Sequence, residues 1–342
     1  MSKCSFKNGL IVEDFGRPYI VAEVNSSHNG DIDIAKKMID SAIEAGCDCV
    51  KFQSWSTESL YSKTYYKENP IAKRFVKKFS LSAEQLKFLA SYSNDKGIDF
   101  SSTPYSEEEV DFLIEDCKVP FIKIASMELN NLDFLRYIGS KKFPIVLSTG
   151  MGEIDEIKRA VKTLKECGIE QMVLLHCVSL YPTKLEYLNL NNILGLREEF
   201  SYPIGFSDHT LGDSAAIAAV ALGAALIEKH LTLDRTKIGM DNAMATEPAE
   251  FKAFVSKCHE IQIALGNKKR TLQPEEYEQR KKMRRSIIAA KDLKVGDILT
   301  RENLYAKRPG TGISPDKIDT ILNKKITRDI ESDTLVYFED VE

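Results

Sequence analysis

The sequence lacks the features that tie a protein to a membrane or to nucleic acid. No apolar run approaches the length of a membrane span, and the first residues, MSKCSFKNG, contain no apolar core of a secretory signal. The formal net charge is −4, whereas a surface that follows nucleic-acid phosphates needs a clustered basic excess. We therefore expect no membrane or nucleic-acid partner, and any anionic ligand has to meet a local group of basic residues.

The seven cysteines form no CxxC pair. Their number is odd, and most of them lie in or beside apolar segments, where cysteine behaves as a small hydrophobic residue. This usage argues against a disulfide framework and favours a reducing compartment. We therefore expect a cytoplasmic location.

What the sequence does contain is an alternation of short apolar, β-rich runs with longer segments of helical period. This alternation is typical of βα units and a parallel sheet. Eight such strands match the count of a closed (β/α)8, or TIM, barrel of the α/β class. An open doubly wound sheet is the alternative, but the chain has no GxGxxG loop, which favours closure. The expected strands span residues 19–24, 49–54, 98–103, 121–126, 144–149, 172–177, 203–208 and 226–231.

The composition divides the chain into two domains. With 342 residues, of which 43% are hydrophobic, the chain can form one large α/β core and a smaller module. Residues 1–266 hold the βα units and end in a helix that begins near Pro248. Residues 267–284 are charged and nearly free of aliphatic side chains, as in a linker or a solvated helix. Residues 285–342 return to short segments and turns, which predicts a compact module of roughly sixty residues.

Polar residues gather at the carboxyl ends of the expected strands, where enzymes with this barrel place their active sites. Four of the five histidines also fall there. The pattern therefore predicts one site at this end of the barrel. The polar residues concerned are Glu23, His28, Lys51, Gln53, Ser102, Thr103, Lys123, Ser126, Ser148, Thr149, His176, Ser207, Asp208, His209, Glu228 and His230.

Lys51 and Lys123 lie within apolar strands. On an exposed edge strand a lysine blocks aggregation, but a closed barrel has no edges. Inside a barrel, each ammonium group needs a buried anionic partner. We therefore expect the two lysines to bind an anion.

His209 and His230 follow neighbouring strands, so their imidazoles can converge on one divalent metal ion. A hydrogen-bonded structural role is the ordinary alternative for a lone histidine, and it is equally open for His176. Asp208 either orients the neighbouring His209 or caps the following helix. The hydroxyls and backbone N–H groups of residues 148–150 suit a turn as well as a phosphate or carboxylate ligand.

The motifs at the strand ends, taken in order, resemble the sialic acid synthase family, whose members condense phosphoenolpyruvate with an N-acetylated hexosamine to form nonulosonic acids. The similarity extends over nearly the whole chain, because the last part resembles the family's antifreeze-like (SAF) C-terminal domain. The resemblance implies a transferase with a TIM barrel followed by a SAF domain, acting as a domain-swapped homodimer. The motifs are VKFQS, SSTP, IKIAS, LSTGM, LLHC with YPT, FSDHT, EKH and KRPGTGIS.

The resemblance also implies a role for each residue that matches a family motif. His209 and His230 would bind a divalent cation, manganese in the first place and magnesium or cobalt as alternatives, and would act in catalysis with Glu23 and Tyr181. The implied phosphoenolpyruvate contacts are Lys51, Thr103, Lys123, Ser126, Ser148, Ser179 and Tyr181. The implied sugar contacts are Glu23, Gln53, Asp241 and, contributed by the small domain of the second subunit, Arg308.

The chain departs from the family pattern in three places. The family commonly has EIGxNH, GSGE and GPDH or GPD, where this chain has EVNSSH, ASME and GMDN. These changes border the expected sugar site, whereas the anion and metal positions are intact. The acceptor is therefore either N-acetylmannosamine or an aldose that differs at its lower carbons. A diacetamido-trideoxyhexose that leads to a legionaminic-type or pseudaminic-type acid is one such aldose.

Other functions fit parts of the pattern. Another phosphoenolpyruvate-dependent aldol synthase would act on a different aldose, but a phosphorylated sugar would need basic residues that VNSSHNG and GMDNAMATEP do not supply. A saccharide-binding protein with an inactive barrel is a second alternative, although the lysines and histidines are intact. A metal-dependent hydrolase is disfavoured because the HxH motif expected at the first strand is absent.

Overall fold

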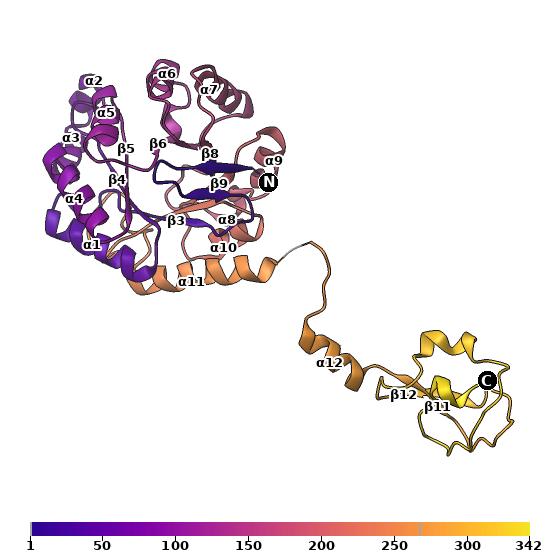
Figure 1. Cartoon of the computed structure of the whole chain (residues 1–342). Coiled ribbons are helices and arrows are strands. Elements are labelled where there is room, and N and C mark those ends of the chain that lie inside the picture. Colours follow the sequence, from indigo (N-terminus) through magenta and orange to yellow (C-terminus); the bar gives the residue numbers. More distant parts are fainter. Residues whose placement is uncertain (1, 267) are drawn as a thin grey trace. The chain divides into compact units, whose positions relative to one another are not determined.

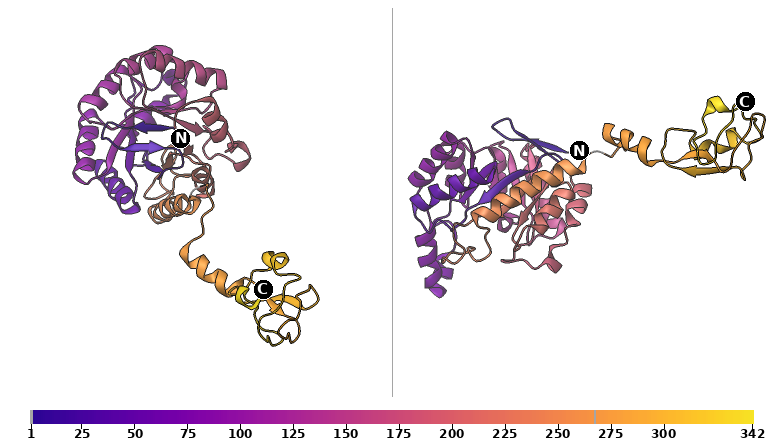
Figure 2. Two further views of the ribbon diagram at one scale, coloured as in Figure 1. Left: turned by 45° about the vertical axis from the view of Figure 1, so that its right-hand side comes forward. Right: turned by 90° about the horizontal axis from the view of Figure 1, so that it is seen from below.

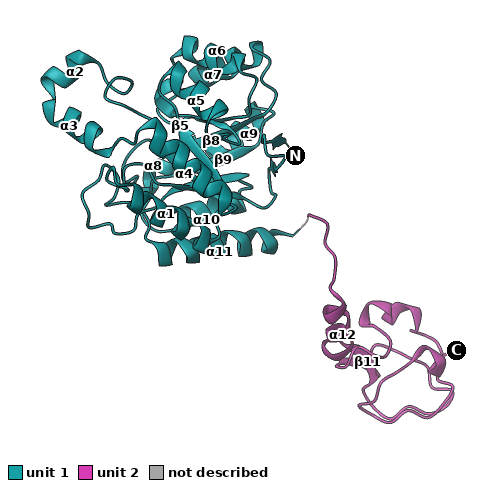
Figure 3. Cartoon of the chain, turned by 60° about the vertical axis from the view of Figure 1, so that its left-hand side comes forward, with its two compact units in different colours: residues 1–266 teal, residues 267–342 magenta. Residues whose placement is uncertain are grey.

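The computed structural model describes residues 2–266 and 268–342; residue 1 and residue 267, the first of the expected linker, lie outside the described residues. The chain separates into two compact units, residues 1–266 and 267–342, which Figure 3 shows in different colours. Each unit has its own hydrophobic core.

Eight parallel strands form the centre of the first unit (Figure 1). They pair in the order β5-β4-β3-β10-β9-β8-β7-β6, and contacts between β5 and β6 close the ring. The arrangement confirms the (β/α)8 barrel that the sequence predicts. The strands are β3 (Tyr19–Glu23), β4 (Cys49–Gln53), β5 (Asp99–Thr103), β6 (Ile122–Ile124), β7 (Ile145–Ser148), β8 (Met172–Cys177), β9 (Ile204–Asp208) and β10 (Leu226–His230).

A layer of helices surrounds the strands (Figure 2). The first of them shows how the sequence defines its ends: Asp31 accepts hydrogen bonds from the backbone N–H groups of Asp33 and Ile34, and Gly46 ends the helix at a φ of 83°. The buried face of each helix packs on the strands and forms the main core. The helices are α1 (Ile32–Ala45), α4 (Ala83–Asp95), α5 (Glu107–Glu115), α6 (Leu132–Ser140), α7 (Ile154–Glu166), α9 (Asn192–Glu199), α10 (Ser214–Ala221) and α11 (Pro248–Leu265).

Additional short helices follow several strands. Between β4 and α4 the chain forms α2 (Lys63–Glu68) and α3 (Pro70–Phe79), which project from the barrel in Figure 3. A single turn, α8 (Leu185–Leu188), precedes α9, and a 3-10 turn (Ser126–Glu128) follows β6. These insertions lengthen the loops at the carboxyl ends of the strands, where the predicted site lies.

An N-terminal hairpin, which the sequence did not predict, covers the amino end of the barrel. Its strands β1 (Lys3–Ser5) and β2 (Ile11–Glu13) pair in antiparallel fashion. The Phe6 ring packs 5.2 Å from the Tyr19 ring and 4.6 Å from the Phe121 ring, as part of a buried apolar cluster. The interior of the barrel is therefore filled from this end by hydrophobic side chains.

The second unit begins with a charged helix and continues as a small β-rich module. Helix α12 (Pro274–Met283) has no buried residue, as expected of a solvated helix in the segment 267–284. Strands β11 (Ser286–Ala289) and β12 (Leu304–Lys307) pair in antiparallel fashion, and 3-10 turns follow at Pro315–Thr320 and Phe338–Asp340. Aliphatic side chains such as Ile287, Leu293, Leu299, Ile313, Ile326 and Val336 form its core.

Among the described residues, no helix combines the length and the apolar composition needed to cross a membrane.

Candidate active site at the carboxyl ends of the barrel strands

A cavity of about 330 Å³ opens at the carboxyl ends of the strands, within the usual range of ~300–1,000 Å³ for small-molecule sites. It brings together the twelve barrel residues to which the family resemblance gave a role, whereas the strand-end residues His28, Ser102, Thr149, His176 and Asp208 do not line it. Arg308 lies in the second unit, where it borders a separate hollow with Lys307 and Arg328. The predicted residues that line the barrel cavity are Glu23, Lys51, Gln53, Thr103, Lys123, Ser126, Ser148, Ser179, Tyr181, His209, His230 and Asp241.

The alternation of side chains along each strand explains this convergence. In β4, Lys51 and Gln53 face the cavity, while the intervening Phe52 packs into the hydrophobic core. In β10, Glu228 and His230 face the cavity in the same way. Polar residues two positions apart near the end of a strand therefore reach one site.

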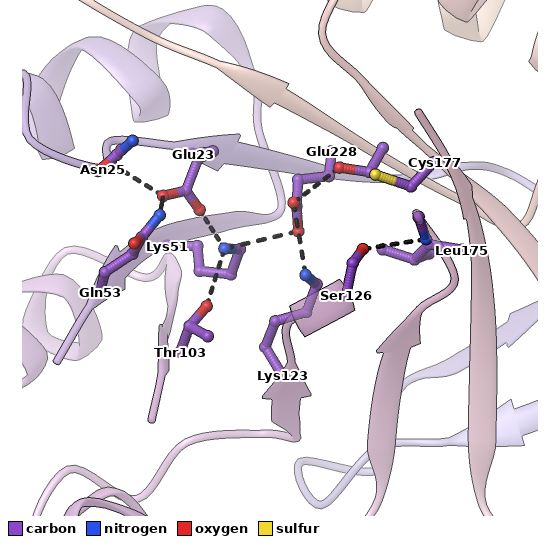
Figure 4. Close-up of polar contacts among 12 residues, drawn as sticks. Glu23, Asn25, Lys51, Gln53, Thr103, Lys123, Ser126, Leu175, Cys177 and Glu228 are labelled. Carbon is purple, nitrogen blue, oxygen red and sulfur yellow. Dashed lines mark hydrogen bonds and ion pairs between the residues drawn. The ribbon is translucent and has the colours of Figure 1, made fainter. Parts of the chain in front are cut away.

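Two lysines and two glutamates form a buried charge cluster in the cavity (Figure 4). Lys51 Nζ pairs with Glu23 and lies 3.6 Å from Glu228 Oε2, and Lys123 Nζ lies 3.6 Å from Glu228 Oε1. Lys51 Nζ also donates to Thr103 Oγ1 at 3.2 Å. The four charged side chains are at most 6% exposed. The anionic partners that the buried lysines require are thus carboxylates of the chain itself.

The cluster changes the pKa values of its members. Burial alone would raise the pKa of Glu228, but the ammonium groups of Lys123 and Lys51 lower it to about 2. Burial raises the pKa of Glu23 against the opposing charge of Lys51. Burial lowers the pKa of Lys123, whose contact with Glu228 is longer than a hydrogen bond. Glu228 is thus a fixed negative charge, whereas Lys123 keeps its donors available for a ligand.

Small hydroxyl residues line another side of the cavity. The Gly150 N–H donates to Ser126 Oγ at 3.0 Å, and Ser148 Oγ is buried without a hydrogen-bond partner in the described part of the chain. A Cβ atom at position 150 would clash with Ser179 Oγ and lie 2.8 Å from Ser126 Oγ. Glycine therefore lets the hydroxyls approach each other, and an orphaned hydroxyl next to them suits the oxygen of an anionic ligand.

His209 follows the last residue of β9 and His230 ends the neighbouring β10; both line the cavity, and their ring centroids are 5.4 Å apart. His209 Nδ1 lies 2.8 Å from the carbonyl oxygen of Val178. Because a carbonyl oxygen only accepts, His209 Nδ1 carries a proton, and Nε2 is the ring nitrogen left for another ligand. Burial and the neighbouring His209 lower the pKa of His230 well below its ordinary value, so that His230 is a neutral imidazole.

This pair fits a metal site that is only partly built from the protein. The neutral His230 is in the form that binds a cation. Burial would lower the pKa of His209, but its contacts with Cys177 raise it, so a bound cation would displace a proton there. No group of three or more potential ligands occurs within residues 2–266 and 268–342. Two imidazole nitrogens would therefore occupy two coordination positions of the cation and leave the others to water and substrate oxygens.

The outer wall of the cavity is largely apolar. Tyr61, Met127, Met151 and Met240 line it and are 41–68% exposed. Below them, Tyr105 Oη donates to Gln53 Oε1 at 2.8 Å, and Gln53 Nε2 donates to Glu23 Oε1 at 3.1 Å. The wall therefore offers apolar surface, while hydrogen-bonding groups lie deeper in the cavity.

Two of the histidines at the strand ends have structural roles. His176 Nε2 lies 2.7 Å from the carbonyl oxygen of Leu188, and its ring stacks on Phe206. His28 Nδ1 accepts from the Gly30 N–H at 3.0 Å. Neither imidazole lines the cavity, so the structural alternative holds for His176.

Asp208 has neither of the two roles that the sequence suggests. Its Oδ1 accepts from the Thr210 N–H at 2.9 Å, and its Oδ2 accepts from Lys229 Nζ at 2.7 Å. The next helix, α10, begins at Ser214 with Asp213 as its N-cap, and within the described residues Asp208 makes no bond to His209. Both alternatives were wrong, because Asp208 faces away from the cavity and pairs with a buried lysine.

Several lining residues had no predicted role. Glu228 was noted as a strand-end residue, yet its position two residues before His230 already places it on the inner face of β10. Cys177 lies with its sulfur 4.0 Å from His209 Nδ1, and Asn25 lines the wall. The periodicity of a strand could have identified Glu228, whereas Asn25 lies in a loop that has no such period.

Known proteins resemble the chain over nearly its whole length. The NeuB family model matches residues 38–270, and the SAF domain model matches residues 284–342. The N,N'-diacetyllegionaminic acid synthase of Legionella pneumophila is 35% identical over 95% of this chain and 94% of that protein. The N-acetylneuraminate-9-phosphate synthase of Mus musculus is 34% identical over 95% of this chain and 92% of that protein.

A solved structure gives the same result for the fold. The N-acetylneuraminic acid synthetase of Leptospira borgpetersenii, crystallised with citrate, has a TM-score of 0.75 and 33% identity, and the match covers 82% of this chain and 95% of that chain. The family matches, the relatives and this structure confirm the resemblance inferred from the strand-end motifs. The chain is a synthase that belongs to the NeuB family and carries a SAF domain at its C-terminal end.

Proposed function

We propose that this synthase condenses phosphoenolpyruvate with an N-acetylated hexosamine and water, giving a nine-carbon 2-keto sugar acid and phosphate. The observation that carries the proposal is the cavity in which two buried ammonium groups, several hydroxyls and two imidazoles converge. A multiply charged enol phosphate suits ammonium and hydroxyl donors, whereas an aldehyde oxygen suits a Lewis acid. Both kinds of group lie in one cavity.

The donor would bind at the lysines and hydroxyls. Lys123 holds only a long contact to Glu228, so its ammonium group can donate to a phosphate or carboxylate oxygen. Ser148 Oγ, buried without a partner among the described residues, is a further donor. The complete set for phosphoenolpyruvate is the one that the resemblance implies: Lys51, Thr103, Lys123, Ser126, Ser148, Ser179 and Tyr181.

His209 and His230 would hold a divalent cation, manganese in the first place and magnesium or cobalt as alternatives. When bound, such a cation polarises the aldehyde oxygen of the open-chain sugar as a Lewis acid. The Tyr181 ring packs 4.3 Å from the His209 ring, and burial raises the pKa of Tyr181. Its hydroxyl therefore stays protonated and can donate to a substrate oxygen near the histidines.

In the reaction, C3 of the enol phosphate attacks the aldehyde carbon, and the positive charge that develops at C2 is captured by water. The tetrahedral carbon then expels phosphate by breaking its C–O bond. Glu23, whose pKa burial raises, is placed to accept a proton from the water or to return one to the sugar oxygen. Glu228, with a pKa of about 2, stays ionised and can stabilise positive charge at C2.

The sugar would contact Glu23, Gln53 and Asp241 in the barrel cavity. Arg308 would act across a domain-swapped homodimer, reaching the site of the other subunit. Of the two acceptors left open by the sequence, the apolar wall favours a diacetamido-trideoxyhexose over N-acetylmannosamine, because deoxy carbons and methyl groups bury well against methionine. Among the described lining residues, Lys51 and Lys123 are the only lysines or arginines, which disfavours a phosphorylated sugar.

The proposal extends to the cell compartment. All seven cysteines are free thiols, as is expected of a protein in the reducing cytoplasm.

The test is phosphate release from phosphoenolpyruvate with each acceptor, together with mass spectrometry of the product. We expect turnover that needs a divalent cation and is lost in His209→Ala, with the thermal unfolding midpoint retained. His259→Ala is a matched control, because this histidine lies in α11 outside the cavity. Absence of phosphate release with every acceptor would refute the proposal, and full activity after stringent chelation would remove the metal from the mechanism.

A further inference from the structure

Two of the segments in which the chain departs from the family pattern bond to each other. Ser27 Oγ donates to Asn242 Oδ1 at 2.6 Å, and Ser26 Oγ accepts from the Met240 N–H at 2.9 Å. Both bonds join the loop that follows β3 to the loop that follows β10. The EVNSSH and GMDN segments therefore form one unit in space.

The bonded groups lie behind the wall of the cavity. Ser26 is fully buried, Ser27 is 6% exposed and Asn242 is 1% exposed, and none of these three residues lines the cavity. Met240 and Asp241, which they flank, do line it. The buried residues can therefore influence a ligand only through the position of the wall.

The loop after β10, residues 231–247, is here called the wall loop, and its described residues make few other hydrogen bonds to the barrel. The backbone N–H groups of Met244 and Ala245 bond to carbonyl groups within the loop itself, and the Thr246 N–H bonds to the His230 carbonyl oxygen where the loop returns to the barrel. Asn25 Nδ2 donates to the Asp241 carboxylate and adds a third link from the first loop. Asp241 Oδ2 also lies 3.6 Å from His230 Nδ1, so the position of the wall depends on this contact with the barrel and on side chains of the loop after β3.

We propose that Ser26, Ser27 and Asn242 form a latch that sets acceptor specificity by fixing Met240 and Asp241 in the wall of the sugar site. The inference rests on the proposed function, because it assumes that this wall meets the acceptor. The latch residues are positioning residues and touch no substrate atom. An apolar thioether beside a carboxylate selects an aminosugar that carries a deoxy carbon or methyl group next to a hydroxyl or amide N–H donor.

The experiment compares Ser27→Ala with Ser54→Ala in the full-length protein. Ser54 is a matched control, because its Oγ lies 2.6 Å from Ser102 Oγ in a buried pair that also lies outside the cavity lining. Steady-state rates are measured with N-acetylmannosamine and with a diacetamido-trideoxyhexose. We expect Ser27→Ala to raise the acceptor KM roughly three- to tenfold, the effect of one lost hydrogen bond, without changing the phosphoenolpyruvate KM.

In Ser27→Ala, the kcat/KM for the diacetamido-trideoxyhexose divided by that for N-acetylmannosamine should also fall. In Ser54→Ala, this ratio and the acceptor KM should stay unchanged. Asn242→Ala should reproduce the effect, and the double variant should be no worse than either single variant, because all three break the same bond. Asn242→Ala decides the question if Ser27→Ala does not fold. If only one acceptor is turned over, its KM decides.

An unchanged acceptor KM in both single variants, additive effects, or an equal rise in the phosphoenolpyruvate KM would overturn the inference while the wild-type enzyme stays active. Lack of phosphate release by the wild-type enzyme with every acceptor would instead defeat the proposed function, and the latch with it.

Discussion

Replacing Lys229 tests whether a buried ion pair holds together the strand ends that carry the histidines. Lys229 and Asp208 are direct partners in the β9–β10 ladder, and each is 1% exposed. Lys229 Nζ donates to Asp208 Oδ2 at 2.7 Å and to the Thr210 carbonyl oxygen at 3.2 Å. His209 and His230 are the residues that follow Asp208 and Lys229, so the ion pair joins the two strands directly beside both histidines.

Lys229→Met should lower the free energy of unfolding of the barrel by about 3–5 kcal/mol, because it leaves the Asp208 carboxylate buried without a counter-charge. Trp55 is the one tryptophan of the chain and lies in the barrel, so its fluorescence during urea denaturation reports on that unit alone. Combining Lys229→Met with Asp208→Asn removes both charges. The double variant should therefore recover part of the loss.

A second Lys–Asp pair of the barrel provides the control. Lys257 Nζ lies 2.6 Å from Asp213 Oδ2, but the lysine side chain is 51% exposed. Water solvates both ions once this pair is broken, so Lys257→Met should hardly change the unfolding curve. The reasoning fails if Lys229→Met costs less than about 1 kcal/mol, or if Asp208→Asn and Lys229→Met have additive effects.

Three further predictions concern the cavity and its surroundings. Gly150→Ala should raise the phosphoenolpyruvate KM roughly tenfold with little change in thermal stability, because the added methyl group displaces Ser179 Oγ; an unchanged KM would show that this hydroxyl makes no contact. Burial lowers the pKa of His28 from 6.5 to about 4, so the unfolded chain gains a proton first as the pH falls, and ~3 kcal/mol of stability present above pH 6.5 is lost by about pH 4. Denaturation at several pH values should show a shallower slope in His28→Gln, and an equal slope would contradict the assignment. Mixed dimers of Arg308→Ala and Glu23→Ala subunits should regain activity if the arginine acts in trans, whereas failure despite confirmed subunit exchange would place it within one chain.

The barrel could be predicted because its strands are buried on both faces. A run such as MVLLHC reads as a continuous apolar segment, and the structure places β8 at the same six residues, Met172–Cys177. Helix ends were equally clear where a capping residue marks them: the Asp31 side chain caps the start of α1, and Gly46 ends the helix in a left-handed conformation. These signals are local, so the sequence contains them in full.

The N-terminal hairpin could not be predicted because its stability is not local. Its strands have three residues each, too short for an alternating pattern to be recognised. The hairpin is held by the packing of Phe6 against Tyr19 and Phe121. Phe121 lies far from Phe6 in the sequence, and the three rings meet only in the closed barrel. Helix α2, with six residues, is likewise too short for a periodic pattern, whereas α3 is amphipathic, with Val76 and Phe79 on its buried face, so its period was present in the sequence and was missed.

At the site, the sequence predicted which residues gather but not how they pair. Closure of the barrel and the strand pleat are enough to bring Lys51 and Lys123 into one cavity. That Glu228 lies between them depends on the register of neighbouring strands, which aligns His230 with Glu23 and Glu23 with Lys51. Strand register is a property of the whole sheet. The sequence could therefore show that the lysines need an anionic partner, but it could not show that this partner is Glu228.

Backbone geometry accounts for one departure from the family pattern, Asn25 in EVNSSH. Asn25 has a φ of 44°, a left-handed conformation that glycine adopts freely and that asparagine tolerates better than most residues. Asparagine therefore fits this left-handed position, and its amide donates to the Asp241 carboxylate. Ser27 and Asn242 join the same two loops by a second side-chain bond, so loss of either partner leaves the other buried without it. The two segments that depart from the family pattern are thus bonded to each other beside the cavity, while the barrel keeps its fold.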